Sequence, residues 1–284
     1  MKISSTDSIN WLHVEASSRC NAWCPACPRN LSGYGLDPIV IEQDLSDTRF
    51  ADVLSQLPDN ITIQFCGNYG DPIAAKNFMA LLDLAIPKAK KIQIHTNGSL
   101  RSTKWWIELA NKLANVDHDI WFGIDGLAGV HEIYRQGTDY NKIIENAQAF
   151  IGAGGYATWQ FIPYAHNEHQ IKDCIRESQR AGFKKFKLVK LYRNTVVARN
   201  YQTGEEFPLL PPKEFQHIIR MPRTRTQVDP SNCMHLSYPS VYLSANGKLS
   251  LCCYLARSKQ FDTFEDLLPT VDLTDKVCLT NCGN

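Results

Sequence analysis

The 284-residue sequence predicts an α/β fold in which helices cover a mainly parallel sheet. Short strand-like runs alternate with helical stretches through the first two thirds of the chain, a pattern typical of βαβ units. Several of these runs are apolar almost throughout, as expected of strands in a covered parallel sheet. Six repeats are too few to close an eightfold barrel. We therefore expect a partial (β/α)6 TIM-like barrel, followed by a small C-terminal domain with a β-hairpin and a helix.

The elements follow in order along the chain. Strands are predicted at residues 11–16, 61–66, 91–96, 119–125, 156–163 and 184–191. Helices are predicted at about residues 48–57, 74–87, 102–115, 139–152 and 168–181. Pro58 ends the first helix, and Ser102 and Asn167 are candidate N-caps of the third and fifth.

The alternation stops near residue 193, which suggests three parts. We expect the barrel at residues 1–200, a linker at 201–231 and a C-terminal domain at 232–284. The linker is rich in Pro, Thr and charge, with one short helix near Pro212–Ile219. In the C-terminal domain two alternating strands flank Asn246-Gly247, the pair that best fits a type I′ hairpin turn.

Composition narrows the classes of function. The net charge of +1 gives no indication of a nucleic-acid partner. No apolar run is long enough to span a membrane, and the N-terminus lacks the apolar core of a secretory signal. We therefore expect a cytoplasmic protein. Its ten cysteines fall mostly in tight groups, which in the cytoplasm indicates metal or redox chemistry.

The first group is Cys20, Cys24 and Cys27, spaced C-x3-C-x2-C directly after the first predicted strand. In parallel α/β folds the carboxyl ends of the strands are where ligands bind. Three thiolates suit a [4Fe–4S] cluster and leave one of its four irons open for an external ligand. The alternatives are a zinc site or unrelated buried thiols. Zinc loops more often use two C-x2-C pairs, and no partner pair lies nearby.

This motif after an opening strand resembles the signature of the radical S-adenosylmethionine (SAM) superfamily. The resemblance implies that SAM binds the open iron and is cleaved reductively to methionine and a 5′-deoxyadenosyl radical, which abstracts hydrogen from a substrate. The family usually has an aromatic residue before the third cysteine, near the adenine. Here that position is Ala26, and Trp23 precedes the second cysteine instead, so Trp23 is our candidate for this contact.

Further SAM contacts are implied at the ends of the following strands. Residues 67–72, GNYGDP, resemble the family's GGEP segment with Asp in place of Glu. Glycines allow close backbone approach, and a carboxylate suits the SAM ammonium. The candidate cofactor contacts besides Trp23 are Tyr69, Gly70, Asp71, Pro72, Asn97, Asp125 and Gln160. For each of the last three residues, a turn or core role is an equal alternative.

The second cysteine group resembles the twitch form of the SPASM modules, which hold auxiliary clusters in many radical SAM enzymes. Its pattern is C-x13-G-x4-C followed by a C-x3-C tail. The implied ligands of a closed auxiliary [4Fe–4S] cluster are Cys233, Cys252, Cys278 and Cys282. Cys253 is the expected spare because neighbouring strand residues point to opposite faces, and Cys253 as the ligand in place of Cys252 is the alternative. A structural zinc site is the alternative.

The expected function is that of a radical SAM oxidoreductase-type enzyme. A closed auxiliary cluster could accept the electron left after hydrogen abstraction, so we expect a two-electron dehydrogenation of a small-molecule or peptide substrate. An external electron donor such as flavodoxin or ferredoxin would be needed. The alternatives are a redox-neutral or bond-forming reaction of the same radical, or a non-catalytic iron–sulfur or zinc-binding protein.

Overall fold

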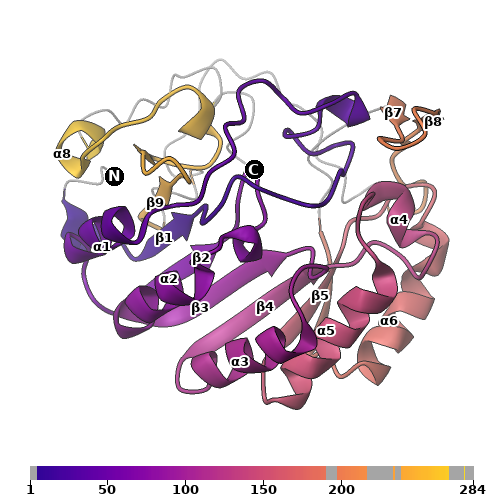
Figure 1. Ribbon diagram of the computed structural model, residues 1–284, viewed down its shortest axis with the longest axis horizontal. Coiled ribbons are helices and arrows are strands. Elements are labelled where there is room, and N and C mark those ends of the chain that lie inside the picture. Colours follow the sequence, from indigo (N-terminus) through magenta and orange to yellow (C-terminus); the bar gives the residue numbers. More distant parts are fainter. Residues whose placement is uncertain (1–4, 190–196, 216–232, 234–237, 269–277, 279–284) are drawn as a thin grey trace.

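The computed structural model describes residues 5–189, 197–215, 233, 238–268 and 278, and its centre is one eight-stranded sheet (Figure 1). The strands lie in the order β10-β9-β1-β2-β3-β4-β5-β6. The first six in the chain are β1 (Trp11–Val14), β2 (Ile61–Phe65), β3 (Ala89–Thr96), β4 (Asp117–Gly123), β5 (Ala157–Phe161) and β6 (Lys185–Leu188). Each pairs in parallel with the next. The predicted partial barrel is confirmed.

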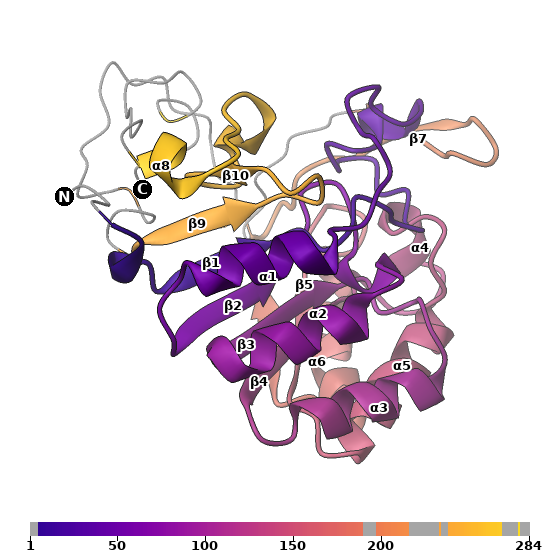
Figure 2. The same ribbon diagram turned by 60° about the vertical axis from the view of Figure 1, so that its left-hand side comes forward.

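Helices pack on one face of the sheet (Figures 1 and 2). They are α1 (Asp47–Ser55), α2 (Phe78–Ala85), α3 (Thr103–Leu113), α5 (Tyr140–Gly152) and α6 (Ile171–Arg180), and short α4 (His131–Tyr134) lies in the β4–α5 connection. Ser102 caps α3 as predicted, since its side chain accepts a hydrogen bond from the Trp105 amide. The predicted cap at Asn167 is wrong. Its side-chain amide donates inward to the carbonyls of Asp125 and Ile162, because a 3-10 turn separates Asn167 from α6.

The two faces of the sheet differ in chemistry. On the helix side the strand residues are apolar and fully buried, as Leu12 and Val14 of β1 illustrate. On the opposite, inner face His13, Gln64 and His95 are partly exposed polar residues. They alternate with the buried residues as strand geometry requires. The helix side therefore supplies the core, and the inner face is free to carry polar groups.

The C-terminal hairpin continues the same sheet rather than standing apart from it (Figure 2). Strand β9 (Ser240–Leu243) pairs in parallel with β1, and β10 (Leu249–Ser250) pairs antiparallel with β9, with short helix α8 (Phe264–Leu267) beyond them. The hairpin prediction is confirmed, but the type I′ turn is wrong. Only Gly247 has a positive φ, because the loop is longer and the glycine follows a turn that begins at Ser244.

The predicted linker carries structure of its own. Strands β7 (Val197–Arg199) and β8 (Glu206–Pro208) form a separate antiparallel pair that straddles the expected boundary at residue 200. Of the short helix expected near Pro212–Ile219, residues 212–215 are not helical, and the remainder lies outside the described residues. No helix in the described part of the chain has the length and apolar character needed to cross a membrane.

Candidate active site

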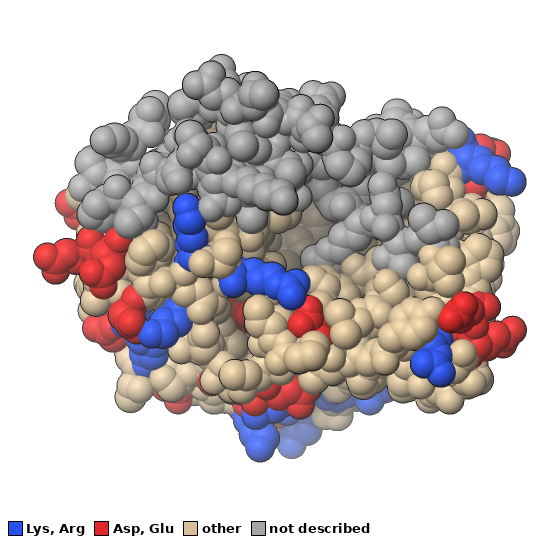
Figure 3. All heavy atoms as spheres, turned by 90° about the horizontal axis from the view of Figure 1, so that it is seen from above, with Lys and Arg blue, Asp and Glu red and all other residues tan. Residues whose placement is uncertain are grey.

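The three cysteines of the first group line one cavity at the carboxyl ends of the parallel strands. Cys20, Cys24 and Cys27 lie on the loop that follows β1, and residues from the ends of β2, β3, β4 and β5 complete the wall. Figure 3 views the molecule from above and shows a recess in the middle of this face. The topology therefore brings the cysteine loop to the edge of the sheet where parallel α/β folds bind ligands.

Backbone hydrogen bonds fix the shape of the cysteine loop. The Cys27 amide donates to the Cys24 carbonyl at 3.0 Å. The fully buried side chain of Asn30 donates to the carbonyls of Ala22 and Cys24 at 3.4 and 3.1 Å. From outside the loop, the Trp23 amide donates to the Gln136 carbonyl at 2.7 Å. The loop is thus held in place by the protein itself.

The chemistry of this donor set fits an iron–sulfur cluster. Burial raises the pKa of Cys24 to about 12 and raises that of Cys20 as well. Thiols in such surroundings give up their protons when metal ions compensate the charge. The Ala22 amide donates to Cys20 Sγ at 3.3 Å, as donors around cluster sulfurs do. Among the described residues, no three His, Cys, Asp or Glu side chains are arranged to hold a single metal ion.

The segment after β2 forms the wall opposite the cysteine loop. Tyr69, Gly70 and Asp71 line the cavity, whereas Pro72 does not. Gly70 presses against the start of the cysteine loop, and a Cβ there would lie 1.9 Å from the Ser17 carbonyl oxygen. The Asp71 amide donates to the Arg19 carbonyl at 2.8 Å. Glycine is therefore required for these two loops to meet.

Asp71 organises two loops with its carboxylate. One oxygen accepts from the Ile73 amide at 3.1 Å and the other from the Asn97 amide at 2.7 Å. Thr96 Oγ1 lies 2.9 and 3.0 Å from the two oxygens. Burial raises the pKa of this carboxyl, and these donors act against that rise. The sequence suggested a partner for an ammonium, and the structure adds a role in joining the ends of β2 and β3.

Asn97 and Gln160 both line the cavity. The Asn97 side-chain amide donates to Asn21 Oδ1 at 3.0 Å and lies 3.7 Å from Cys20 Sγ, and its oxygen accepts from Ser99. It is thus in contact with a cysteine sulfur. Gln160 reaches the cavity from β5, beside His95 of β3, which also lines it.

Asp125 is fully buried and does not line the cavity, but it holds a residue that does. Its carboxylate accepts from Arg135 Nε at 2.6 Å and from the Ile162 amide at 2.6 Å. Burial alone would lower the pKa of Arg135, but Asp125 and Cys24 raise it, so the guanidinium stays charged. Arg135 is the one Lys or Arg among the described residues of the cavity wall.

Sequence reasoning missed Arg135. It lies ten residues after its partner, in the connection that contains α4, and no local pattern marks it. The space it occupies depends on Gly123, where a Cβ would come within 2.6 Å of the guanidinium. Only the folded chain brings this cation to the cysteine cavity.

The structure does not bring Trp23 into the cavity. Its ring stacks on Tyr201 with centroids 5.2 Å apart and planes 5° from parallel. Both residues line a separate depression near the β7–β8 pair. Trp23 therefore attaches the cysteine loop to the segment that follows the barrel.

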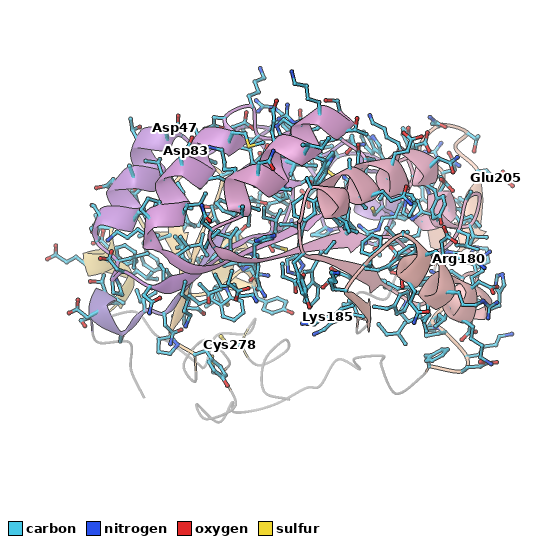
Figure 4. All side chains as sticks on the ribbon, turned by 90° about the horizontal axis from the view of Figure 1, so that it is seen from below. Asp47, Asp83, Arg180, Lys185, Glu205 and Cys278 are labelled. Atoms are coloured by element: carbon cyan, nitrogen blue, oxygen red, sulfur yellow. The ribbon has the colours of Figure 1, made fainter. Side chains whose placement is uncertain are left out.

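Three of the four predicted auxiliary ligands are buried. Cys233, Cys252 and Cys278 are each at most 4% exposed and belong to the main core, whereas Cys253 is partly exposed. Figure 4 shows Cys278 on the side of the sheet opposite Asp47 and Asp83 of the helix layer. The prediction for Cys282 lies outside the described residues.

No family model matches the chain, and neither does any curated protein sequence. Solved structures do match. One of anSMEcpe with bound AdoMet has a TM-score of 0.60 at 15% identity, covering 94% of this chain and 81% of that one. Another, with AdoMet and Cp18Cys peptide, has a TM-score of 0.50 at 18% identity and covers 69% and 54%. SuiB of Streptococcus suis bound to precursor peptide SuiA has a TM-score of 0.60 at 14% identity and covers 96% and 65%.

This protein thus covers about half to four fifths of the length of the two anSMEcpe chains and about two thirds of the length of SuiB. At these identities the likeness concerns the fold. It extends over 94% to 96% of this chain in two of the matches. The chain has the fold of the radical SAM enzymes of the SPASM/twitch subgroup, to which anSME and SuiB belong.

Proposed function

We propose that this protein is a radical SAM enzyme that acts on a peptide or small-molecule substrate. The observation that carries the proposal is the convergence of Cys20, Cys24 and Cys27 on one cavity, with the GNYGDP segment as the opposite wall. Three sulfurs leave one position of a [4Fe–4S] cluster for SAM. When bound, cluster and SAM would supply a 5′-deoxyadenosyl radical that abstracts hydrogen from the substrate.

The chain's own residues would bind and orient these groups. The three cysteines hold the cluster, and Asn97 contacts the sulfur of Cys20. The charged Arg135 faces the same cavity and is a suitable partner for the carboxylate of SAM. Backbone groups of Tyr69 and Gly70 lie across from the cysteines, where the amino group would bind.

We further propose that residues 232–284 form a twitch-like auxiliary unit. Cys233, Cys252, Cys278 and Cys282 would hold a second, closed [4Fe–4S] cluster. The burial of three of them beside the sheet supports this assignment, and the partial exposure of Cys253 agrees with its being the spare. A closed cluster suits electron transfer, so the proposed reaction is a two-electron dehydrogenation, with flavodoxin or ferredoxin supplying the first electron in the cytoplasm.

A peptide is the favoured substrate class because three of the matched structures contain one. SuiB was solved with precursor peptide SuiA and anSMEcpe with Cp18Cys peptide. The second candidate function is a redox-neutral or bond-forming reaction of the same radical, for which the auxiliary unit would have a structural role. A non-catalytic iron–sulfur or zinc protein is the remaining alternative.

Anaerobic reconstitution tests the proposal. The protein is loaded with iron and sulfide and then given SAM and dithionite, and 5′-deoxyadenosine and methionine are measured. Wild type should form both products, and Cys24→Ala should form neither. Cys174→Ala is the matched control, because Cys174 is a buried cysteine of α6 that lines no part of the cavity. Bound zinc, or a first cluster with four protein ligands, would contradict the proposal.

Iron content tests the auxiliary unit separately. Two [4Fe–4S] clusters amount to about eight irons per chain. The double variant Cys252→Ala/Cys278→Ala, which leaves two of the four proposed thiolates, should retain about four irons and should still cleave SAM when SAM is saturating. An unchanged iron content in that variant would rule out the proposed ligand set.

A further inference from the structure

The loop that walls the SAM cavity is hydrogen-bonded to the C-terminal cysteine segment. Asn68 lies in that loop and lines the cavity. Its side-chain amide donates to the carbonyl oxygen of Cys253 at 2.7 Å, across 185 residues of sequence. The acceptor is the residue next to Cys252, so one side chain connects the wall of the cavity with the second cysteine group.

Glu15 makes a second connection at the same place. Its buried carboxylate accepts from the Tyr69 amide at 2.7 Å. Burial raises its pKa, and the amides of Tyr69, Gly70 and Ala245 favour its charged form. Ala245 belongs to the β9–β10 connection, so Glu15 lies between the cavity loop and the C-terminal hairpin.

The cavity loop has little freedom to move independently of these partners. A Cβ on Gly67 would lie 2.3 Å from the Gly70 carbonyl oxygen and 3.0 Å from Glu15 Oε1. The loop is therefore folded tightly on itself and against Glu15. A shift of the Cys253 carbonyl would therefore displace the loop residues that face SAM.

The position of the Cys253 carbonyl depends on the chain around Cys252. Cys252 is buried, and its carbonyl accepts from the amides of Leu255 and Ala256 at 3.2 Å each. This turn fixes the direction of the next carbonyl. Metal ligation at Cys252 would restrain the same turn and so preserve the acceptor that Asn68 uses.

We propose that metal loading of the C-terminal cysteines raises the affinity of the cavity for SAM, with Asn68 as the positioning residue that connects the two. This proposal rests on the proposed function. The coupling is reciprocal, so SAM also tightens metal retention at the C-terminal cysteines. The auxiliary unit then has a regulatory effect in addition to any electron transfer.

The experiment measures the dissociation constant of SAM for the iron-loaded protein by anaerobic equilibrium dialysis. Losing one neutral hydrogen bond should weaken binding about three- to tenfold in Asn68→Ala. Asn68→Asp keeps the shape but loses the donor and should be at least as weak. Asn111→Ala on exposed α3 is the control and should bind like wild type.

Hydrogen exchange supplies a readout that does not depend on activity. Amides 67–71 should exchange faster in Asn68→Ala than in the control. Cys278→Ala should weaken SAM binding by a similar factor, and the double variant should be no weaker than Cys278→Ala alone, since both changes remove one connection. If Cys278→Ala does not fold, Cys252→Ala takes its place in both comparisons.

Wild-type affinity and wild-type exchange in Asn68→Ala would overturn the inference, as would multiplying effects in the double variant. Failure of the proposed function gives a different result, because wild type itself would then neither bind nor cleave SAM.

Discussion

Replacing Arg135 with methionine should destabilise the protein in a pH-dependent manner. The substitution removes the charged partner, 2.6 Å away, of an Asp125 that has no exposed surface. Removing one member of a buried ion pair typically costs about 3–5 kcal/mol. Burial raises the pKa of Asp125 even beside Arg135, and without the guanidinium the pKa should rise further.

The magnitude follows from the cost of keeping Asp125 protonated. Keeping this carboxyl protonated in the folded state costs about 4 kcal/mol at pH 7 and about 2 kcal/mol at pH 5.5, because the unfolded Asp, with the ordinary pKa of 3.8, is ionised at both values. A carboxyl with a raised pKa in the folded state loses stability as pH rises above its unfolded value. The stability deficit of Arg135→Met, the difference between its free energy of unfolding and that of wild type, should therefore become smaller as the pH is lowered. A loss of about 4 kcal/mol corresponds to a fall in Tm of about 8–16 °C.

Anaerobic denaturant unfolding at pH 7 and 5.5 measures the deficit. Combining Asp125→Asn with Arg135→Met should recover much of the stability at pH 7, because an amide can still accept from the Ile162 amide without an unpaired charge. A deficit below about 1 kcal/mol at pH 7, or an equal deficit at both pH values, would refute the reasoning.

Three further outcomes are expected. Gly70→Ala should lower the free energy of unfolding by about 1–3 kcal/mol and weaken SAM binding, because the added Cβ would clash with the Ser17 carbonyl. Gly152→Ala is the control: its Cβ would enter open space, so thermal unfolding should show a neutral or slightly stabilising effect. Burial holds the pKa of His131 at about 3, and its imidazole accepts from the Asp125 amide. Wild type should therefore lose about 2 kcal/mol more than His131→Gln between pH 7 and pH 5 in denaturant titrations, because only the unfolded histidine takes up the proton. Asn97→Ala should lower the midpoint potential of the first cluster by about 40 mV in an anaerobic redox titration. This shift is the equivalent of losing one hydrogen bond of about 1 kcal/mol to the Cys20 sulfur. An unchanged potential would contradict a hydrogen bond from Asn97 to that sulfur.

The alternation of strands and helices and the first cysteine motif could be predicted from local sequence. A strand such as 61–65 is recognisable from its own residues, because apolar composition and period express which faces are covered. The spacing of Cys20, Cys24 and Cys27 likewise lies within one loop. The cavity residues Tyr69, Gly70 and Asp71 could be named because their segment resembles the family's GGEP motif, and the loop that follows a parallel strand lies at the edge of the sheet where ligands bind.

Contacts between segments distant in sequence were decided only by the tertiary structure. Arg135 lies at the cavity because its side chain binds Asp125 and because Gly123 has no side chain in the space that the guanidinium occupies. Trp23 lies outside the cavity, where its ring stacks on Tyr201. Pairing of β9 with β1 brings the C-terminal hairpin next to the first strand, and the side chain of Asn68 then contacts the carbonyl of Cys253. Local sequence sets backbone conformation and burial period. Which distant side chains meet depends on packing the whole chain, a property that no short window of sequence contains.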